Sequence, residues 1–423
     1  MPAQARVVLF IVTSFWAYGE LAIATEFAGR MAGTGFRPLF LIPPSHRKLL
    51  RDADLPHQVL IPGSGKLNRL QLQDIQLTHR PVLVVLADFM NFDFCERHYG
   101  LRRADLEMFS CPVGTFDNFS WGRDGAWLDT YGFKARYEGD ISMDGLSFRL
   151  RPCPLNDPSG RTDEPGLYPY PLLADAAGRW LAARAGPAAA RVRAELDIPV
   201  GRPAVLLTCA TWQQMHAAYP RVKAYVQACT AMVERLVCRV LKHADVVLVG
   251  PSTLFPDGAP TGFRALGQVT PSRFQDVAAA VDLHLSNNIV SVSLHRLALA
   301  GIPSVNLYSA LTKRGGVLGT DVALSGYATA VVGAVDYLYP FRMFPVGWYH
   351  FLDSLLAGNP FTDLVAAVEL FGEESSAETV LALLSPGQPR RQVEAARQAY
   401  LHALDQLPGV GTILSELTTW SGG

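Results

Sequence analysis

One stretch decides the fold: Asp282-Leu-His-Leu-Ser-Asn-Asn-Ile-Val-Ser-Val-Ser-Leu-His-Arg-Leu-Ala-Leu-Ala-Gly-Ile-Pro-Ser-Val-Asn-Leu-Tyr308. Its first residues are typical of a buried strand, and a polar turn with Asn287 and Asn288 follows. The spacing of apolar residues then predicts a helix from about Val290 to Ala300, which ends at Gly301-Ile-Pro303 before a second strand. The stretch therefore predicts a βαβ unit.

A polar loop that opens a helix after a parallel strand is a common anion site. The first N–H groups of a helix have no partner within it, and the helix dipole adds positive potential at the same end. We therefore expect the loop from Asn287 to Ser293 to bind phosphate. The alternative is a solvated loop with no ligand.

Strands and helices also alternate on the amino-terminal side of this unit. The predicted strands are continuous apolar runs, which are typical of parallel strands buried on both faces, at Val7–Val12, Arg37–Ile42, Pro81–Ala87, Pro203–Leu207, Asp245–Val249 and Phe263–Leu266. The predicted helices between them are Glu20–Ala32, Arg221–Lys242 and Ser272–Ala280. This order predicts an α/β protein with two tandem Rossmann-like, doubly wound domains.

The 423 residues are enough for two domains of roughly 200 residues each. Prolines in Pro152–Pro158 and Tyr168–Pro171 indicate a boundary loop. We expect an N-terminal domain at 1–172, a connector at 173–200, a second domain at 201–372 and C-terminal helices at 373–423 that pack back on the first domain. Amphipathic helices are predicted near 360–372, 376–384 and 389–406.

Composition excludes several classes of partner. Lys and Arg total 37 against 38 Asp and Glu, with no basic block, so we expect no nucleic-acid partner. The six cysteines lack the close pairing of zinc or dithiol motifs, which favours reduced thiols and a cytoplasmic location. Arg6 and the apolar run Val7–Phe15 imitate a secretory signal, but Leu21–Ala32 carries charges like an amphipathic helix. No uncharged run reaches the roughly 20 residues of a membrane span, and the Ala-, Arg- and Pro-rich composition suggests a high-GC bacterium.

The chain resembles the GT-B glycosyltransferases, whose two Rossmann-like domains face each other across a cleft. The likeness rests on Gly19-Glu20 after the first strand and on the segment Phe263–Tyr308 with its Gly301-Ile-Pro303. In that family the second domain holds a nucleotide-diphosphate sugar. The resemblance therefore implies a sugar donor as co-substrate, of the UDP or dTDP type, and a small-molecule acceptor.

The same resemblance assigns donor-binding residues. Val269 and Thr270 stand in place of the family's Val-Pro-Gln turn, and Asn288 stands where many members have the His of His-Gly-Gly. Ile289 and Val290 replace the two glycines, and Arg296 replaces a ribose-binding Glu, although an arginine can only donate hydrogen bonds. Hydroxyl, amide or cationic groups near the same edge complete the set, which is Thr208, Thr211, Gln213, Val269, Thr270, Asn287, Asn288, Ser291, Ser293, Lys313 and Arg314.

Two acidic residues are the catalytic candidates. Glu20 stands where many inverting relatives place a catalytic His, so it is a candidate general base; the alternative is a first-turn residue favoured by the helix dipole. Asp88 directly follows a buried strand, and it either orients the acceptor, relays a proton or caps the next segment.

Aromatic side chains suggest a hydrophobic or aromatic acceptor, unless they form core. The acceptor candidates are Trp16, Tyr18, Phe89, Asp117, Trp121 and Trp348.

The leading hypothesis is an inverting glycosyl transfer in specialised-metabolite biosynthesis. Preorganised N–H groups would stabilise the departing diphosphate, so neither a metal nor a cofactor is expected. The paired glutamates of retaining relatives are missing around Gly301, which favours inversion. One alternative is a sugar-nucleotide 2-epimerase, although Thr208-Cys-Ala-Thr-Trp-Gln213 does not match the Thr-His-Arg-x-Glu-Asn segment of those enzymes. Another is a non-catalytic protein that keeps the fold, because the His-Gly-Gly and the catalytic His are missing.

Overall fold

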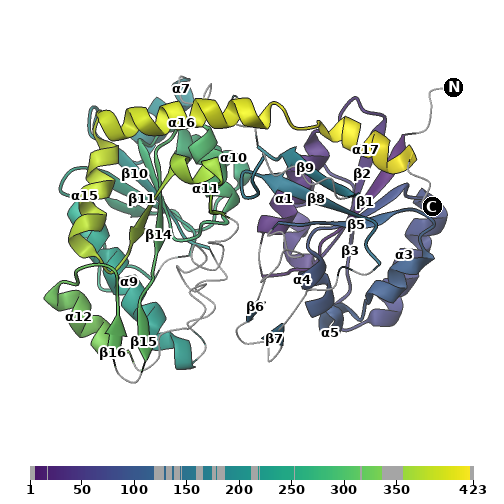
Figure 1. The fold of residues 1–423 in the computed structure, drawn as a ribbon, viewed down its shortest axis with the longest axis horizontal. Helices are drawn as coiled ribbons and strands as arrows, with labels where there is room; N and C mark the ends of the chain where they lie inside the picture. The colour runs from purple at the N-terminus through teal and green to yellow at the C-terminus, as the bar shows by residue number, and fades with distance from the viewer. Residues whose placement is uncertain are drawn as a thin grey trace. The chain divides into compact units, whose positions relative to one another are not determined.

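A computed structural model describes residues 5–16, 18–118, 128–129, 136–137, 143, 145–158, 165–173, 178, 186–210, 218, 220–251, 253–314, 317–335 and 356–419. The chain forms two compact units (Figure 1). Unit 1 consists of Met1–Leu172 and Ala403–Gly423, and unit 2 consists of Leu173–His402.

Unit 1 contains a seven-stranded parallel sheet in the order β3-β2-β1-β4-β5-β8-β9. The strands are β1 (Arg6–Ile11), β2 (Phe36–Ile42), β3 (His57–Val59), β4 (Leu83–Leu86), β5 (Val113–Phe116), β8 (Phe148–Cys153) and β9 (Leu167–Pro171). Its helices are α1 (Gly19–Gly29), η1 (Pro44–His46), α2 (Arg47–Asp52), α3 (Gly65–His79), α4 (Phe89–Phe94), α5 (Glu96–Tyr99), η2 (Arg103–Met108) and α17 (Val410–Thr419). A separate short antiparallel pair joins β6 (Leu128–Asp129) and β7 (Arg136–Tyr137).

The strand order of unit 1 reverses between β1 and β4. Every described residue of β4 and all but the first of β1 are buried, as continuous apolar strands covered on both faces require. In doubly wound folds, the loops after the two strands at such a point lead to helices on opposite faces, and ligands commonly bind at the carboxyl ends of these strands.

Unit 2 repeats the pattern with a six-stranded parallel sheet in the order β12-β11-β10-β13-β14-β17. The strands are β10 (Ala204–Thr208), β11 (Asp245–Val249), β12 (Phe263–Ala265), β13 (Leu283–Ser286), β14 (Ser304–Tyr308) and β17 (Val365–Glu369), and a hairpin joins β15 (Thr312–Arg314) to β16 (Val317–Gly319). Its helices are α7 (Pro187–Glu195), α9 (Pro220–Val240), α10 (Pro271–Ala279), α11 (Val292–Leu299), α12 (Gly326–Gly333), η4 (Pro360–Leu364), α15 (Glu373–Leu384) and α16 (Gln388–Leu404). Here the order reverses between β10 and β13.

The two parallel sheets confirm the α/β, doubly wound fold expected from the sequence. The predicted βαβ unit is present as β13, α11 and β14, and Gly301 ends the helix with a φ of 74°. In unit 1, the last helix α17 packs near the α1–β2 turn, because a Cβ atom on Gly411 would lie 2.9 Å from Thr34 Cγ2.

Two edge strands correct the sequence-based expectations. The predicted boundary loop Tyr168–Pro171 lies in β9, at the edge of the unit 1 sheet, where a proline leaves no ladder hydrogen bond unmade. The predicted helix 360–372 is instead a 3-10 turn followed by β17, which pairs with β14 at the edge of the unit 2 sheet. Its apolar residues fit either period, and the pairing with β14 favours the strand. Within the described residues, no helix is long and apolar enough to cross a bilayer.

Candidate functional site

The structure brings the two predicted catalytic residues together at the reversal point of unit 1. Glu20 lies in the first turn of α1, after β1, and Asp88 is the N-cap of α4, after β4. Asn91 contacts both carboxylates: its side-chain amide donates to Glu20 Oε1 at 2.6 Å, and its backbone N–H donates to Asp88 Oδ1 at 2.8 Å. Sequence reasoning missed Asn91, although its place three residues after an Asp N-cap predicts the backbone bond.

Burial raises the pKa of both carboxyl groups. Glu20 is 9% exposed, and desolvation raises its pKa well above 4.5, with a further rise from the charge of Asp88. Ser14 and Asn91 act in the opposite direction. Desolvation also raises the pKa of Asp88 to about 7, against the lowering effect of the Asn91 and Met90 backbone groups. Two such neighbours titrate as a unit, so we expect at least one of the two carboxyl groups to be protonated below about pH 7.

Buried polar atoms beside this pair have unused hydrogen-bonding capacity. Glu20 Oε2 and Ser14 Oγ are both buried without a hydrogen-bond partner among the described residues. Ser14 lies close enough to lower the pKa of Glu20, although the two oxygens do not meet hydrogen-bond geometry. Buried groups of this kind are rare in native proteins and frequently have a functional role.

Aromatic rings surround the loop between β1 and α1. The Phe15 ring lies 4.7 Å from Trp16 and 4.7 Å from His98, each edge to face. Tyr18 stands 4.7 Å from His46 and is 38% exposed. Trp16 and Tyr18 therefore lie near Glu20 in the chain, and each belongs to a separate group of contacting rings.

The other acceptor candidates occupy different settings. Phe89 is 1% exposed and packs under the Arg103 guanidinium, which is 5.2 Å from the ring centroid. Asp117 is fully buried after β5 and forms an ion pair with Arg151 at 3.0 Å. Both contacts are typical of core positions. Trp121 and Trp348 lie outside the described residues.

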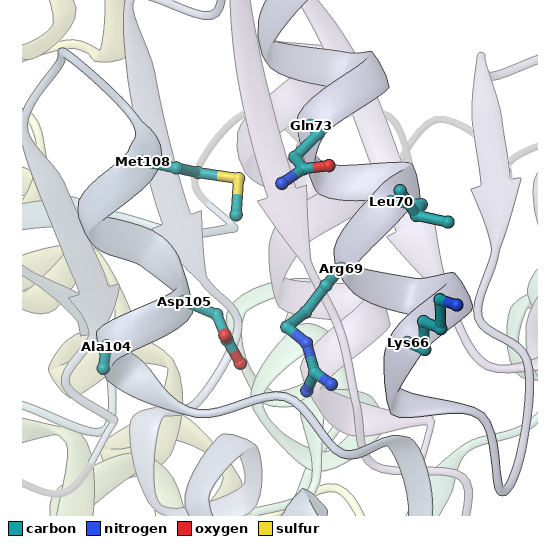
Figure 2. Close-up of a pocket in the computed structure, with 7 residues that line it drawn as sticks. All are labelled: Lys66, Arg69, Leu70, Gln73, Ala104, Asp105 and Met108. Atoms are coloured by element: carbon teal, nitrogen blue, oxygen red, sulfur yellow. The ribbon is translucent and has the colours of Figure 1, made fainter.

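A surface hollow of about 330 Å³ lies elsewhere in unit 1 (Figure 2). Side chains from α3 face side chains from η2 across it, and its lining is Lys66, Arg69, Leu70, Gln73, Ala104, Asp105 and Met108. None of the predicted site residues lines this hollow, so it is separate from the carboxylate pair.

In unit 2, the predicted phosphate loop is held by its own polar groups. The Ser286 hydroxyl accepts from the Asn288 N–H and donates to the Asn288 carbonyl, both at 3.2 Å. Asn288 Oδ1 accepts from the Val290 N–H at 3.2 Å, and His295 Nε2 lies 2.8 Å from the Ile289 carbonyl. Burial lowers the pKa of His295 to about 4, so its neutral ring donates to that carbonyl. His295 was not predicted, and it fixes the loop from the first turns of α11.

The start of α11 keeps its N–H groups available. Its N-cap Ser291 makes no side-chain capping bond, and the Ser291 and Ser293 hydroxyls bond each other at 2.6 Å. Ile289 and Val290 are not among the non-glycine residues with positive φ, so this loop does not need the two family glycines. A helix start with available N–H groups is suited to donate hydrogen bonds from these groups to an anion.

The remaining donor candidates are distributed around the same sheet. Thr208 is the last residue of β10, is 8% exposed and lies beside β13. Thr270 is the N-cap of α10, where its hydroxyl accepts from the Arg273 N–H at 3.2 Å, and Val269 precedes it. The Lys313 ammonium donates to the Val335 carbonyl at 2.6 Å, just beyond the end of α12, so it is already engaged as a helix cap.

The structure describes the side chains of three donor candidates only in part or not at all. Arg314 pairs with Val317 in the hairpin, which locates its backbone. Thr211 and Gln213 lie outside the described residues. The fourth candidate, Asn287, is described by the structure: it is buried, in the turn that follows β13. In the part of the chain that the structure describes, His, Cys, Asp and Glu side chains form no group suited to hold a metal ion.

Comparisons with known proteins agree with this architecture. Spinosyn forosaminyltransferase SpnP is 12% identical with a TM-score of 0.55, over 99% of both chains. UGT89C1 of Arabidopsis thaliana, in complex with quercetin, is 11% identical with a TM-score of 0.55, over 98% of this chain and 99% of its own. Glycosyltransferase VinC, in complex with DTDP, is 11% identical with a TM-score of 0.53, over 98% of both chains.

Sequence comparison gives a more limited result. No curated protein matches the chain. Residues 27–422 match a family described only as a family of unknown function, DUF6365. The match covers most of the chain, with large parts of both units, so the chain belongs to the family DUF6365, and its fold is that of the GT-B glycosyltransferases.

Proposed function

We propose that this protein transfers a sugar from a nucleotide-diphosphate sugar to a small hydrophobic or aromatic acceptor, with inversion at the anomeric carbon. The observation that carries the proposal is the carboxylate pair Glu20–Asp88 at the reversal point of unit 1, combined with an anion-binding helix start at the reversal point of unit 2. Each is in the place where doubly wound folds bind ligands.

The donor binds to unit 2 in this proposal. The free N–H groups at the start of α11, with the hydroxyls of Ser291, Ser293 and Thr208, receive the diphosphate. Negative charge grows on the diphosphate as the sugar leaves, and preorganised donors stabilise it more in the transition state than in the bound donor. Nucleosides of the uridine or thymidine type are the proposed bases, and the VinC complex with DTDP supports the choice.

The carboxylate pair acts as the general base on unit 1. A carboxyl group with a pKa near the working pH can accept the proton of an attacking hydroxyl, because its ionised form is present and the transfer is not strongly uphill. The singly ionised pair supplies this base: when Asp88 holds the proton of the pair, the ionised Glu20 takes the proton of the attacking hydroxyl, and both carboxyl groups are then neutral. Trp16 and Tyr18 form the proposed acceptor surface beside it.

The proposed setting is the cytosol of a bacterium, in the tailoring of a specialised metabolite. All six cysteines are free thiols, which suits a reducing compartment. Spinosyn forosaminyltransferase is one of the structures that share the fold, and this supports a specialised metabolite as the product.

The test combines nucleotide binding with transfer. UDP and TDP are titrated calorimetrically into the full chain, and UDP- and TDP-sugars are then incubated with a panel of aromatic aglycones and analysed by mass spectrometry. We expect Glu20→Gln to abolish transfer while leaving nucleotide affinity unchanged, and Glu26→Gln, on the same helix, to keep both.

Other results would point to other functions. Nucleotide binding with no transfer to any acceptor would indicate a non-catalytic protein. Formation of a 2-epimer from the donor alone would indicate an epimerase. If neither UDP nor TDP binds, the assignment of the donor site is refuted.

A further inference from the structure

His284 lies beneath the carboxyl edge of the unit 2 sheet and contacts a residue of the proposed donor site. It is the second residue of β13 and is fully buried, and its Nε2 atom lies 2.9 Å from Thr208 Oγ1. In the parallel register, Thr208 is level with Ser286, two residues beyond His284 on the same face of β13. The imidazole therefore extends toward the carboxyl edge of the sheet, where its Nε2 atom contacts the threonine hydroxyl.

The surroundings of the ring decide which nitrogen carries the proton. Burial lowers the pKa of His284 to about 3, so the ring is neutral and has one N–H. Its Nδ1 atom is buried without a hydrogen-bond partner among the described residues. A proton on Nδ1 would create a buried donor with no acceptor, which is rarer in native proteins than an unsatisfied acceptor. The proton therefore belongs on Nε2, where it is donated to Thr208 Oγ1.

The direction of this hydrogen bond determines whether the Thr208 hydroxyl can donate a hydrogen bond to a ligand. When Oγ1 accepts from His284, the hydroxyl hydrogen is left to donate elsewhere, and the described residues provide it with no other hydrogen-bond partner. Thr208 ends β10, which neighbours β13 and the loop that opens α11. With the opposite polarity, the oxygen lone pairs would face the ligand and repel an anion.

We propose that His284 is a positioning residue that holds the Thr208 hydroxyl as a hydrogen-bond donor to a phosphate oxygen of a nucleoside diphosphate. The inference rests on the proposed function of unit 2, because it assigns a role at the same donor site. His284 itself does not touch the ligand.

Asn306 provides the competing arrangement. It lies on β14, level with Ser286 on the same face, and both of its side-chain polar atoms are buried without a partner in the described chain. A proton on Nδ1 of His284 would be satisfied only if the Asn306 side chain moved within hydrogen-bond distance and accepted it. Thr208 would then have to donate to Nε2, and its hydrogen would be lost to the ligand.

The tautomer is measured by NMR on the full chain labelled with 15N-histidine. The resonances of His284 are assigned by their loss in His284→Gln, and the long-range coupling pattern identifies the protonated nitrogen. We expect the Nε2–H tautomer. Observation of the Nδ1–H tautomer overturns the proposal whether or not any nucleotide binds.

The effect on the ligand is measured by calorimetric titration of UDP and TDP. We expect Thr208→Val and His284→Leu each to weaken binding by about tenfold or more, as for a lost hydrogen bond to a charged group. We expect the double variant to bind no more weakly than Thr208→Val alone, because His284 acts through Thr208. Thr208→Ser and His284→Gln keep the hydroxyl and an N–H donor, so they are expected to stay within about threefold of the wild type.

The possible failures are distinguishable. If the wild type binds neither nucleotide, the donor site itself is refuted. If it binds but the two losses are additive, or if Thr208→Val has no effect, only the positioning role is refuted. Thermal unfolding of each variant shows whether a loss of binding reflects loss of the fold, and the two conservative variants remain informative in that case.

Discussion

Replacing Asp88 by Asn is expected to stabilise unit 1 at neutral and alkaline pH. Asp88 is 5% exposed, and burial raises the pKa of its carboxyl group from 3.8 to about 7. A raised carboxyl pKa means that the folded state holds the proton more tightly than the unfolded state. Its favourable effect is complete below pH 4 and is lost as the pH rises through 7. The wild type therefore carries a penalty above pH 7 that an uncharged side chain avoids.

The size of the effect follows from the two pKa values. A difference of about 3 pKa units, at about 1.36 kcal/mol per unit, gives a penalty of about 4 kcal/mol above pH 7. At pH 5 only the unfolded carboxyl is ionised, so the penalty falls to about 2 kcal/mol. Asparagine caps helices as well as aspartate does, so the bond from the Asn91 N–H is retained.

Hydrogen exchange read by mass spectrometry tests this prediction on unit 1 alone. Peptides from β1 and β4 report the opening free energy of its core, and comparison of two proteins at one pH cancels the intrinsic exchange rate. The control is Asp93→Asn, because Asp93 is partly exposed and pairs with Arg103 at 2.5 Å. That change is expected to destabilise by at most about 1 kcal/mol. An Asp88→Asn variant that is less stable than the wild type at pH 8, or a gain that is equal at pH 5 and pH 8, refutes the reasoning.

Three further changes probe other contacts. Arg151→Met removes the ion pair that Arg151 forms with the fully buried Asp117. We therefore expect the opening free energy reported by β5 peptides to fall by about 3–5 kcal/mol, and an unchanged value would contradict this prediction. Glu373 accepts from Arg235 and Arg239 at 2.6 and 2.8 Å, and the hydrogen bond from Arg235 is the main cause that lowers its pKa to about 2. Glu373→Gln should therefore destabilise unit 2 by about 1–2 kcal/mol at pH 7, since the arginines are partly exposed, and the gap to the wild type in urea unfolding should close as the pH falls from 4.5 toward 2. Gly250 has a φ of 120°, and a Cβ atom there would lie within 2.2 Å of the Cys209 carbonyl oxygen, next to Thr208. Gly250→Ala should lower the melting temperature and weaken UDP and TDP binding. The control is Gly258→Ala, because Gly258 has a similar φ of 131° but no atom near the added Cβ, so its effects should be smaller. Equal effects of the two variants would show that the contact with Cys209 is unimportant.

Local patterns in the sequence were enough to predict the α/β class and most of the central strands. Strands β1, β4, β10 and β11 are short, largely apolar runs that are buried on both faces, and this pattern is visible within each segment alone. The βαβ unit could be predicted in the same way, because its polar turn and the helix end at Gly301-Ile-Pro303 are local features. Glu20, Asp88 and the helix start near Ser291 were predicted as site residues for the same reason: each follows a recognisable strand.

The contacts between these residues could not be predicted from the sequence. Asn91 joins Glu20 across 71 positions of sequence, and His284 contacts Thr208 across 76. Such contacts depend on the order of strands in the sheet, which periodicity does not encode. The edge strands β9 and β17 were missed for a related reason: pairing with a neighbour outweighed their prolines and their ambiguous apolar spacing. The pKa values of the carboxylate pair belong to the same category, because desolvation depends on everything that packs around a side chain and not on its neighbours in the chain.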